Sequence, residues 1–340
     1  MTRVIDAADG VQRRWSVLGY PIGVIYKYFD DQGNYLAAII TYYAFISIFP
    51  LLLLGSTILG FFLEGDAERQ QELIDSALAQ FPIIGDQLGR PEGLTGSSTV
   101  VLVGGLVALY GALGLGQALQ NALNVAWSVP RNSRPNPILL RLKSLFLLVT
   151  AGVAVLAISA LSILVSHTEV LGEDLSSFKW PITLLTVTVN TVVLTLLFRV
   201  GAARSHRLWQ GSIPGAVTAS VMWLGLQSIG TLYVTNVVTK TTGMNQTFAL
   251  VLGLIGVIWL AAVIGVLGIE VNVVLDRRLW PRALLTPFTD HVELTEADRR
   301  AYAGYARAQR HKGFETVEVT FAQIGLQMPD DEDDGADHAS

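Results

Sequence analysis

An uncharged stretch of 28 residues, Leu36 to Leu63, constrains this chain more than any other part of its sequence. Because an α-helix rises about 1.5 Å per residue, about 20 apolar residues are enough to cross the hydrocarbon core of a bilayer. A buried helix of a soluble protein is the alternative for short apolar runs, but the length of this stretch favours a membrane span. Pro50 predicts a kink in it, because proline leaves one helical carbonyl without its N–H partner.

Composition places the rest of the chain in the same class. Charged residues make up 15% of the sequence and hydrophobic residues 51%, whereas soluble domains have about 25% charged residues. Six acids in the last eleven residues account for the formal net charge of -5, so the remainder is close to neutral. The absence of cysteine excludes disulfides and cysteine-ligated zinc. These observations favour one all-α membrane domain with short extensions.

Five further apolar segments bring the predicted number of spans to six. The predicted spans cover residues 36–63, 99–116, 144–165, 180–198, 213–238 and 247–275. We expect the connection Pro130–Lys143 to be non-helical because it contains three prolines. Pro214 is expected in the first turn of the fifth span, where its missing N–H is not needed. The predicted domain boundaries are an N-terminal arm (1–35), the membrane domain (36–278) and a tail (279–340).

The charges of the connections alternate along the chain. Cationic clusters lie before the first span, at Pro130–Lys143, at Arg199–Gln210 and from Asp276 onward. The other connections are acidic or nearly neutral. Because lysine and arginine are enriched on the cytoplasmic side of membrane proteins, this alternation predicts that both termini are cytoplasmic.

The segments outside the spans carry weaker signals. Apolar residues at helical spacing in the N-terminal arm fit either an interfacial helix, which Pro21 would break, or a partly ordered arm. In the tail, Thr295 with Asp298 predicts a capping box that opens a helix. Phe314–Phe321 alternates like a short strand, and the acidic end is expected to be disordered. We interpret the tail as solvated, with a weak docking segment as the alternative.

Polar side chains in or beside the spans are the candidate functional residues. Polar groups are costly toward lipid, so we expect them to face the interior of the helix bundle. The candidates are Tyr42, Tyr43, Ser47, Pro50, Gln117, Asn121, Asn124, Asn190, Gln227, Thr231, Thr235, Glu270 and Asn272. For each candidate taken alone, we favour a role in hydrogen bonding between helices. For the candidates taken together, we favour a transport pathway. A second pattern, small residues four apart at Gly104, Ala108, Ala112 and Gly116, predicts close helix packing.

Glu270 is the only carboxylate inside the predicted spans. An ionisable group in a span is a functional candidate, but Glu270 precedes Asp276 by only six residues and a side chain there can reach the interface. The helical period places it about 200° from Gly268, away from the small-residue face of its helix. Its predicted partners are Arg199, Arg204 or lipid headgroups. A structural ion pair is favoured over a proton-coupled role.

Signatures of enzymes are absent from the sequence. No lysine follows a glycine as in a phosphate-binding loop, and neither a Gly-x-Ser-x-Gly elbow nor a His-Glu-x-x-His zinc helix occurs. The five histidines are scattered along the chain. The sequence therefore predicts no enzyme, no cofactor, no metal site and no nucleic-acid partner.

Four motifs resemble signatures of the YihY/BrkB family of bacterial inner-membrane proteins. Asp30–Leu54, DDQGNYLAAIITYYAFISIFPLLLL, is similar to the opening signature, and Gln117–Trp127, QALQNALNVAW, to the second. Trp209–Ala216, WQGSIPGA, resembles the third, and Leu267–Asn272, LGIEVN, resembles a Leu-Gly-Ala-Glu-Leu-Asn ending. The resemblance extends from the first residue to about the end of the sixth span.

The chain departs from the family pattern in two places. After the fourth span it has FRVGAA, where a Tyr and a Pro are usual. Met244–Phe248 lacks the usual Tyr-Gly. In this second departure the chain resembles the branch that contains YhjD-like proteins.

The resemblance implies a polytopic protein of the bacterial cytoplasmic membrane. Some family members were once named ribonuclease BN, a label later withdrawn, and others are associated with serum resistance or with export of envelope lipids. Phosphodiester hydrolysis needs clustered carboxylates that hold metals or paired acid and base groups, so the single carboxylate in the spans argues against a ribonuclease.

The function that the resemblance implies is transport or export of a lipid, a glycolipid or another amphipathic envelope component. The alternative is a non-transporting membrane scaffold that binds partners. Membrane lipids are expected to surround the spans in either case. Formation of a homo-oligomer is left open.

Overall fold

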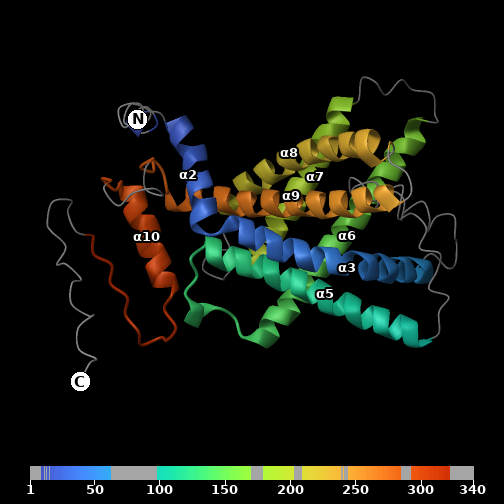
Figure 1. Ribbon diagram of the computed structural model, residues 1–340, viewed down its shortest axis with the longest axis horizontal. Coiled ribbons are helices and arrows are strands. Elements are labelled where there is room, and N and C mark those ends of the chain that lie inside the picture. The colour runs from blue at the N-terminus through green and yellow to red at the C-terminus, as the bar shows by residue number, and fades with distance from the viewer. Residues whose placement is uncertain are drawn as a thin grey trace. The chain divides into compact units, whose positions relative to one another are not determined.

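The computed structural model describes residues 9–10, 12, 14, 16–62, 98–169, 179–202, 209–238, 240, 244–284 and 292–321. Its helices are α2 (Ser16–Asp30), α3 (Gly33–Phe62), α5 (Ser98–Ala126), η1 (Arg131–Ser133), α6 (Pro137–Glu169), α7 (Lys179–Gly201), α8 (Trp209–Tyr233), η4 (Val234–Val238), α9 (Met244–Arg277) and α10 (Glu296–Ala308) (Figure 1). The described residues contain no strand, so the all-α prediction is confirmed for them.

The chain divides into two compact units. The larger unit comprises Val24–Val129 and Ser133–Arg278. The smaller unit comprises Met1–Gly23, Pro130–Asn132 and Leu279–Ser340. Each unit has its own set of buried contacts.

Three helices of the larger unit are long and apolar enough to cross a membrane. They are Thr183–Gly201, Gly211–Asn236 and Phe248–Arg277, of 19, 26 and 30 residues. A shorter apolar stretch, Gly33–Ile48, lies in α3. Large apolar side chains on these helices are exposed, and such a surface is stable in hydrocarbon but not in water. The chain is a multi-pass membrane protein.

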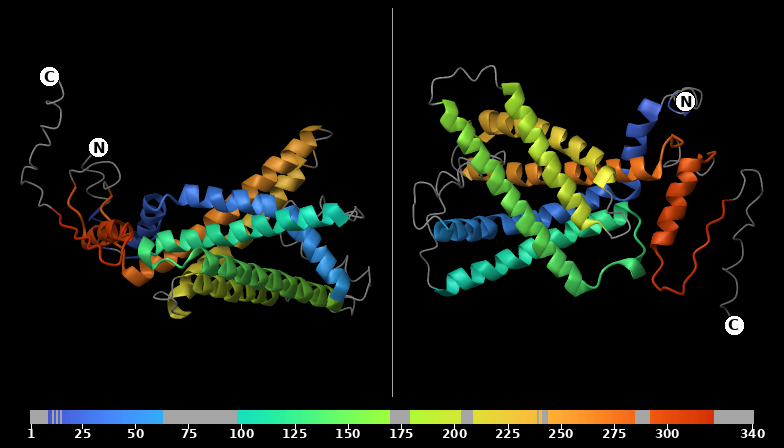
Figure 2. Two further views of the ribbon diagram at one scale, coloured as in Figure 1. Left: turned by 90° about the horizontal axis from the view of Figure 1, so that it is seen from below. Right: turned by 180° about the vertical axis from the view of Figure 1, so that it is seen from behind.

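Six helices of the larger unit pack in chain order. From α3 through α5, α6, α7, α8 and α9, each packs against the next, and α3 also packs against α9. Figure 1 shows α9 with α8 on one side and α3 on the other. In the left view of Figure 2, α3 changes direction toward its light-blue end, in agreement with the kink predicted at Pro50.

Glycines allow the closest helix contacts in this unit. A Cβ added at Gly215 of α8 would lie 1.8 Å from the backbone oxygen of Gly268 of α9. Beside this contact, the Gly215 N–H donates to Asn272 Oδ1 at 2.7 Å. The predicted small-residue face of α5 is confirmed at Gly116, where a Cβ would lie 2.6 Å from Ser144 Cβ of α6. The surroundings of Gly104 and Ala108 lie outside the described part of the structure.

Cationic side chains bind helix ends at one end of this unit. Arg277 Nη2, at the end of α9, donates to the Trp127 carbonyl at 2.5 Å, just past the end of α5. Lys143 Nζ, near the start of α6, donates to the Gly201 carbonyl at 2.8 Å, at the end of α7. Carbonyls at helix C-termini carry partial negative charge and lack intrahelical partners, so cations stabilise them. These contacts bring the start of α6 together with the ends of α5, α7 and α9.

The helix α6 begins earlier than predicted. It starts at Pro137, so the prediction that the whole connection to Lys143 is non-helical is wrong. Asn136 Oδ1 accepts a hydrogen bond from the Leu139 N–H at 2.8 Å, as an N-cap residue does. Proline is favoured at the position that follows the cap, because it has no N–H to leave unsatisfied.

Pro21 and Pro214 also lie inside helices. The helix α2 runs through Pro21, so the predicted break is wrong. A proline inside a helix costs about 3 kcal/mol, and the helix is continuous here although Pro21 itself is exposed. Pro214 lies inside α8 rather than in its first turn, because α8 already begins at Trp209.

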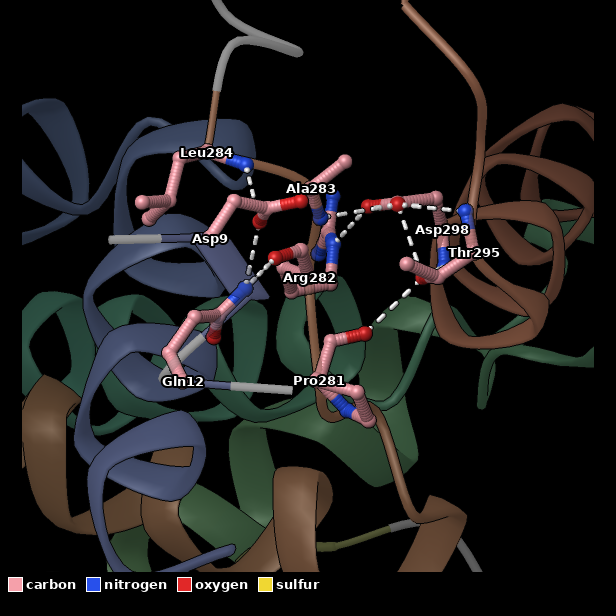
Figure 3. A network of polar contacts seen from close by, with 8 residues as sticks. All are labelled: Asp9, Gln12, Pro281, Arg282, Ala283, Leu284, Thr295 and Asp298. Atoms are coloured by element: carbon pink, nitrogen blue, oxygen red, sulfur yellow. Dashed lines mark hydrogen bonds and ion pairs between the residues drawn. The ribbon is translucent and has the colours of Figure 1, made fainter. Parts of the chain in front are cut away.

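A buried polar network holds the smaller unit together (Figure 3). The Asp298 carboxylate accepts from Arg282 Nε, from the Ala283 N–H at 3.1 Å and from the Thr295 N–H at 2.9 Å. The Arg282 and Asp298 side chains are fully buried. Thr295 Oγ1 accepts from the Asp298 N–H at 3.1 Å, so the predicted capping box is confirmed and α10 begins at Glu296.

The start of the chain is part of the same network (Figure 3). The Gln12 side-chain amide donates to the Arg282 carbonyl and to Asp9 Oδ1, the latter at 2.9 Å. Asp9 Oδ1 also accepts from the Leu284 N–H at 3.2 Å. Because Arg282, Ala283 and Asp298 are buried, the interpretation of the tail as solvated is wrong for this part of it.

The last described segment has no regular structure. Phe314–Phe321, predicted as a short strand, is neither strand nor helix. A strand needs a partner for its backbone N–H and C=O groups, and the described residues offer no second strand. The acidic end, residues 322–340, lies outside the described residues.

Candidate functional site

A pocket of about 320 Å³ lies between α3, α5 and the segment that leads into α6. Its lining residues are Ile39, Tyr43, Gly114, Gln117, Ala118, Asn121, Asn124, Arg134 and Leu140. We call this site the polar pocket. It brings together four of the candidate residues, namely Tyr43, Gln117, Asn121 and Asn124.

One face of α5 supplies the amides of the polar pocket. Gln117, Asn121 and Asn124 are four and three residues apart, so they project from the same side of the helix. Gln117 is exposed, Asn121 is half-buried and Asn124 is buried. The three amides therefore differ in how far they are shielded from solvent.

Tyr43 forms one wall of the polar pocket because α5 has a glycine opposite it. A Cβ at Gly114 would lie 2.2 Å from the Tyr43 ring, so only glycine allows the ring to lie there. The Tyr43 ring also meets the rings of Tyr42 and Tyr110 edge-on, with centroids 5.2 Å and 6.5 Å away. Tyr42 itself is 59% exposed and does not line the pocket.

Arg134 adds a cation to the polar pocket. Its Nη1 donates to Asn121 Oδ1 at 3.4 Å and its Nε to the Val129 carbonyl at 3.4 Å. Sequence reasoning counted Arg134 only among the charges that set membrane orientation. The sequence feature that could have indicated its role is the position of Arg134: it lies in a basic connection without acidic residues, directly after the polar residues of α5.

Gln120 lies beside the pocket and joins two of its walls. Its Nε2 donates to Ser144 Oγ at 2.8 Å and to the Leu140 carbonyl at 3.0 Å. Gln120 and Ser144 are both buried. These bonds fix the start of α6, and with it Leu140, against α5.

A second group of polar residues surrounds Glu270; we call Lys27, Asp31 and Glu270 the charge cluster. Glu270 is 0% exposed and lies 3.6 Å from Lys27 Nζ. Lys27 also forms an ion pair with Asp31, in the corner between α2 and α3. That corner includes Gln32, whose positive φ of 56° reverses the chain.

The partner predicted for Glu270 is wrong. Lys27 takes the place expected for Arg199 or for a headgroup, and Arg204 lies outside the described residues. The predicted direction is confirmed, because Gly268 faces Gly215 while Glu270 faces the α2–α3 corner.

Burial sets the protonation behaviour of the groups beside Glu270. It raises the pKa of the Asp31 carboxyl above its ordinary value, although the Lys27 ammonium acts in the opposite direction. Burial also raises the pKa of the Tyr28 hydroxyl, and the negative charge of Glu270 adds to this rise. In the smaller unit, burial raises the pKa of Tyr20 to about 12.

Other candidates have structural contacts. Ser47 is buried, and a Cβ at Gly111 of α5 would lie 2.9 Å from Ser47 Cβ. The Asn272 side chain binds the Gly215 N–H, as described above. Pro50 lies within α3, and its side chain is outside the described residues. Ser47 and Asn272 hold helices together and do not line the polar pocket.

The candidates on α7 and α8 lie away from the polar pocket. Asn190 and Gln227 are half-buried. Thr231 and Thr235 are exposed, so the prediction that they face the bundle interior is wrong. Their hydroxyls donate to backbone carbonyls of Gln227 and Thr231, each at 3.0 Å, which satisfies them without a neighbouring helix.

Among the described residues, no group of three or more His, Cys, Asp or Glu side chains is placed to hold a metal ion. The polar pocket has one cation, three amides and a tyrosine, and no carboxylate. Such a lining can bind and orient a polar or anionic group by hydrogen bonds.

Comparison with known proteins places the chain in a family. The family model described as virulence factor BrkB matches residues 24–287, which is more than half of the chain. The match does not distinguish branches of the family, so the YhjD-like assignment stays a prediction. Neither the curated proteins nor the solved structures contain a match. The chain therefore belongs to the virulence factor BrkB family.

Proposed function

We propose that the larger unit crosses the bacterial cytoplasmic membrane six times, with both termini in the cytoplasm. In addition to the helices already described as long and apolar enough, α3, α5 and α6 have 30, 29 and 33 residues. At about 1.5 Å per residue, each exceeds a hydrocarbon core of about 30 Å.

The contacts at the helix ends support this topology. The start of α6 meets the end of α7, the start of α8 meets the end of α9, and the ends of α9 and α5 meet. Such contacts are expected when consecutive spans alternate in direction. The cations Lys143 and Arg277 lie at these ends, which is the cytoplasmic side by the positive-inside rule.

We further propose that the protein transports a lipid, a glycolipid or another amphipathic envelope component across this membrane. The polar pocket is the observation that carries the proposal. Apolar side chains beside it are exposed, including Ile39, Leu139 and Leu142, at 44%, 54% and 63%. An amphipathic molecule places its headgroup among polar groups and its chains on an apolar surface, and this site offers both.

The lining of the polar pocket favours an anionic or hydroxyl-rich headgroup. Arg134 supplies charge-assisted hydrogen bonds, and the amides of Gln117, Asn121 and Asn124 can donate or accept. The volume of about 320 Å³ falls at the lower end of the range for ligand sites, roughly 300–1,000 Å³. A pocket of this kind favours transport over a scaffold that is packed solid.

Asn121→Leu is expected to slow transport about tenfold, because it removes a hydrogen-bond partner of Arg134 and of the headgroup. The measurement is the initial rate at which the full chain, reconstituted in liposomes, moves fluorescently labelled anionic lipids between leaflets. Thr231→Val is the control, since Thr231 is exposed and bonds only its own helix. Rates that are equal for wild type, Asn121→Leu and protein-free liposomes would contradict the proposal.

A further inference from the structure

The charge cluster contains more acid than base. The structure gives Lys27 an ion pair with Asp31 and a second with Glu270 at 3.6 Å. The side chains of all three are almost completely buried, with exposures of 1% for Lys27, 2% for Asp31 and 0% for Glu270. With both carboxyls ionised, this buried set would carry an uncompensated negative charge, which low-dielectric surroundings strongly disfavour.

Glu270 is also short of hydrogen bonds. Neither of its carboxylate oxygens has a hydrogen-bond partner among the described residues. The polar atoms of a buried side chain normally have at least one hydrogen-bond partner, and an ionised carboxylate can only accept. A proton shared with the neighbouring Asp31 carboxyl, which interacts electrostatically with Glu270, would supply the donor that these oxygens lack.

The surrounding elements supply few other charges. The negative charge of Asp30 raises the pKa of Asp31, and the negative charge of Glu270 raises the pKa of Tyr28. The helices α3, α5 and α8, which pack against α9, contain no Asp, Glu, Lys, Arg or His, so their titratable groups are tyrosines. The helix α9 itself adds only Asp276 and Arg277, close to its end.

We propose that Asp31 and Glu270 together hold one exchangeable proton beside Lys27, so that the charge cluster is a proton-binding site joining the α2–α3 corner to α9. Binding one proton leaves one carboxylate to balance the Lys27 ammonium. The raised pKa of Asp31 agrees with this arrangement. The inference concerns the resting protein and does not depend on transport.

Infrared spectroscopy of the full-length protein in detergent, with spectra compared between H₂O and D₂O, tests the proposal. The wild type at neutral pH is expected to show the C=O stretch of a protonated carboxyl, shifted in D₂O. Both Asp31→Asn and Glu270→Gln are expected to lose this band, because each leaves one carboxylate against one ammonium. Asp276→Asn, which changes an exposed acid at the end of the same helix, is expected to keep it.

A band missing from the wild type, or retained in either single variant, would overturn the shared proton. A bound metal cation in place of the proton would give the first of these results. If one variant fails to fold, the wild type and the other variant still decide this point.

The pH dependence of stability gives a second readout. The unfolded chain releases the Asp31 proton near the ordinary pKa of an aspartate, 3.8, whereas the folded cluster keeps it to higher pH. The folded state then binds more protons, so the wild type should lose stability as pH rises through the folded-state pKa. As pH rises through this pKa, the apparent Tm of Asp31→Asn and of Glu270→Gln is expected to increase relative to that of the wild type. A decrease relative to the wild type would contradict the proposal.

Discussion

Gly215→Ala is expected to destabilise the larger unit by about 1–3 kcal/mol or more, the range for overpacking a close contact. The added Cβ would lie 1.8 Å from the Gly268 backbone oxygen and 2.6 Å from Asn272 Nδ2. The first of these atoms belongs to the backbone and cannot rotate away, so α8 and α9 have to separate. Separation also weakens the bond from the Gly215 N–H to Asn272, which is 2.7 Å long in the native contact.

Gly225→Ala on the same helix is the matched control for this measurement. A Cβ at Gly225 would meet nothing within 4 Å. Alanine is a better helix former than glycine, so this variant is expected to be more stable by about 0.5–1 kcal/mol. Thermal unfolding of the purified variants in one detergent compares the two. Equal transition temperatures would show that α8 and α9 do not pack as closely as described.

Lys27→Met is expected to cost about 3–5 kcal/mol, because removing one partner of a buried ion pair leaves uncompensated charge. Here the loss leaves the Asp31 and Glu270 carboxyls without their shared cation. The expected result is a lower unfolding temperature and less protein in the membrane. Lys240→Met is the control, because Lys240 is exposed and bonds Asn236 on the preceding turn. Stability of Lys27→Met equal to that of Lys240→Met would mean that Lys27 does not neutralise the cluster.

The sequence predicted those features that depend on local residue patterns. Apolar runs located the helices, and the Thr295 and Asp298 pair predicted the capping box that opens α10. Gln117, Asn121 and Asn124 were candidates because they are polar residues in or beside a span, and the structure shows that they line a pocket.

Features that depend on contacts between distant segments were not predictable in this way. Helical periodicity gave the direction of Glu270 but not its partner, because Lys27 reaches it only through the fold of the α2–α3 corner. Arg134 enters the polar pocket because the chain turns back after α5; the position of the basic connection was visible in the sequence, but the contact with Asn121 depends on that turn. The proposed strand at Phe314–Phe321 failed for the same reason, since strands require partners that alternation alone does not supply.

Single-cysteine labelling tests the six-span topology most directly, and the natural absence of cysteine makes every introduced thiol unique. Ser133 and Lys240 are both exposed, and the proposed topology places them on opposite sides of the membrane. A membrane-impermeant maleimide added to intact spheroplasts is expected to label Lys240→Cys and to reach Ser133→Cys only after the membrane is opened. Labelling of Ser133→Cys in intact spheroplasts, with Lys240→Cys protected, would contradict the topology.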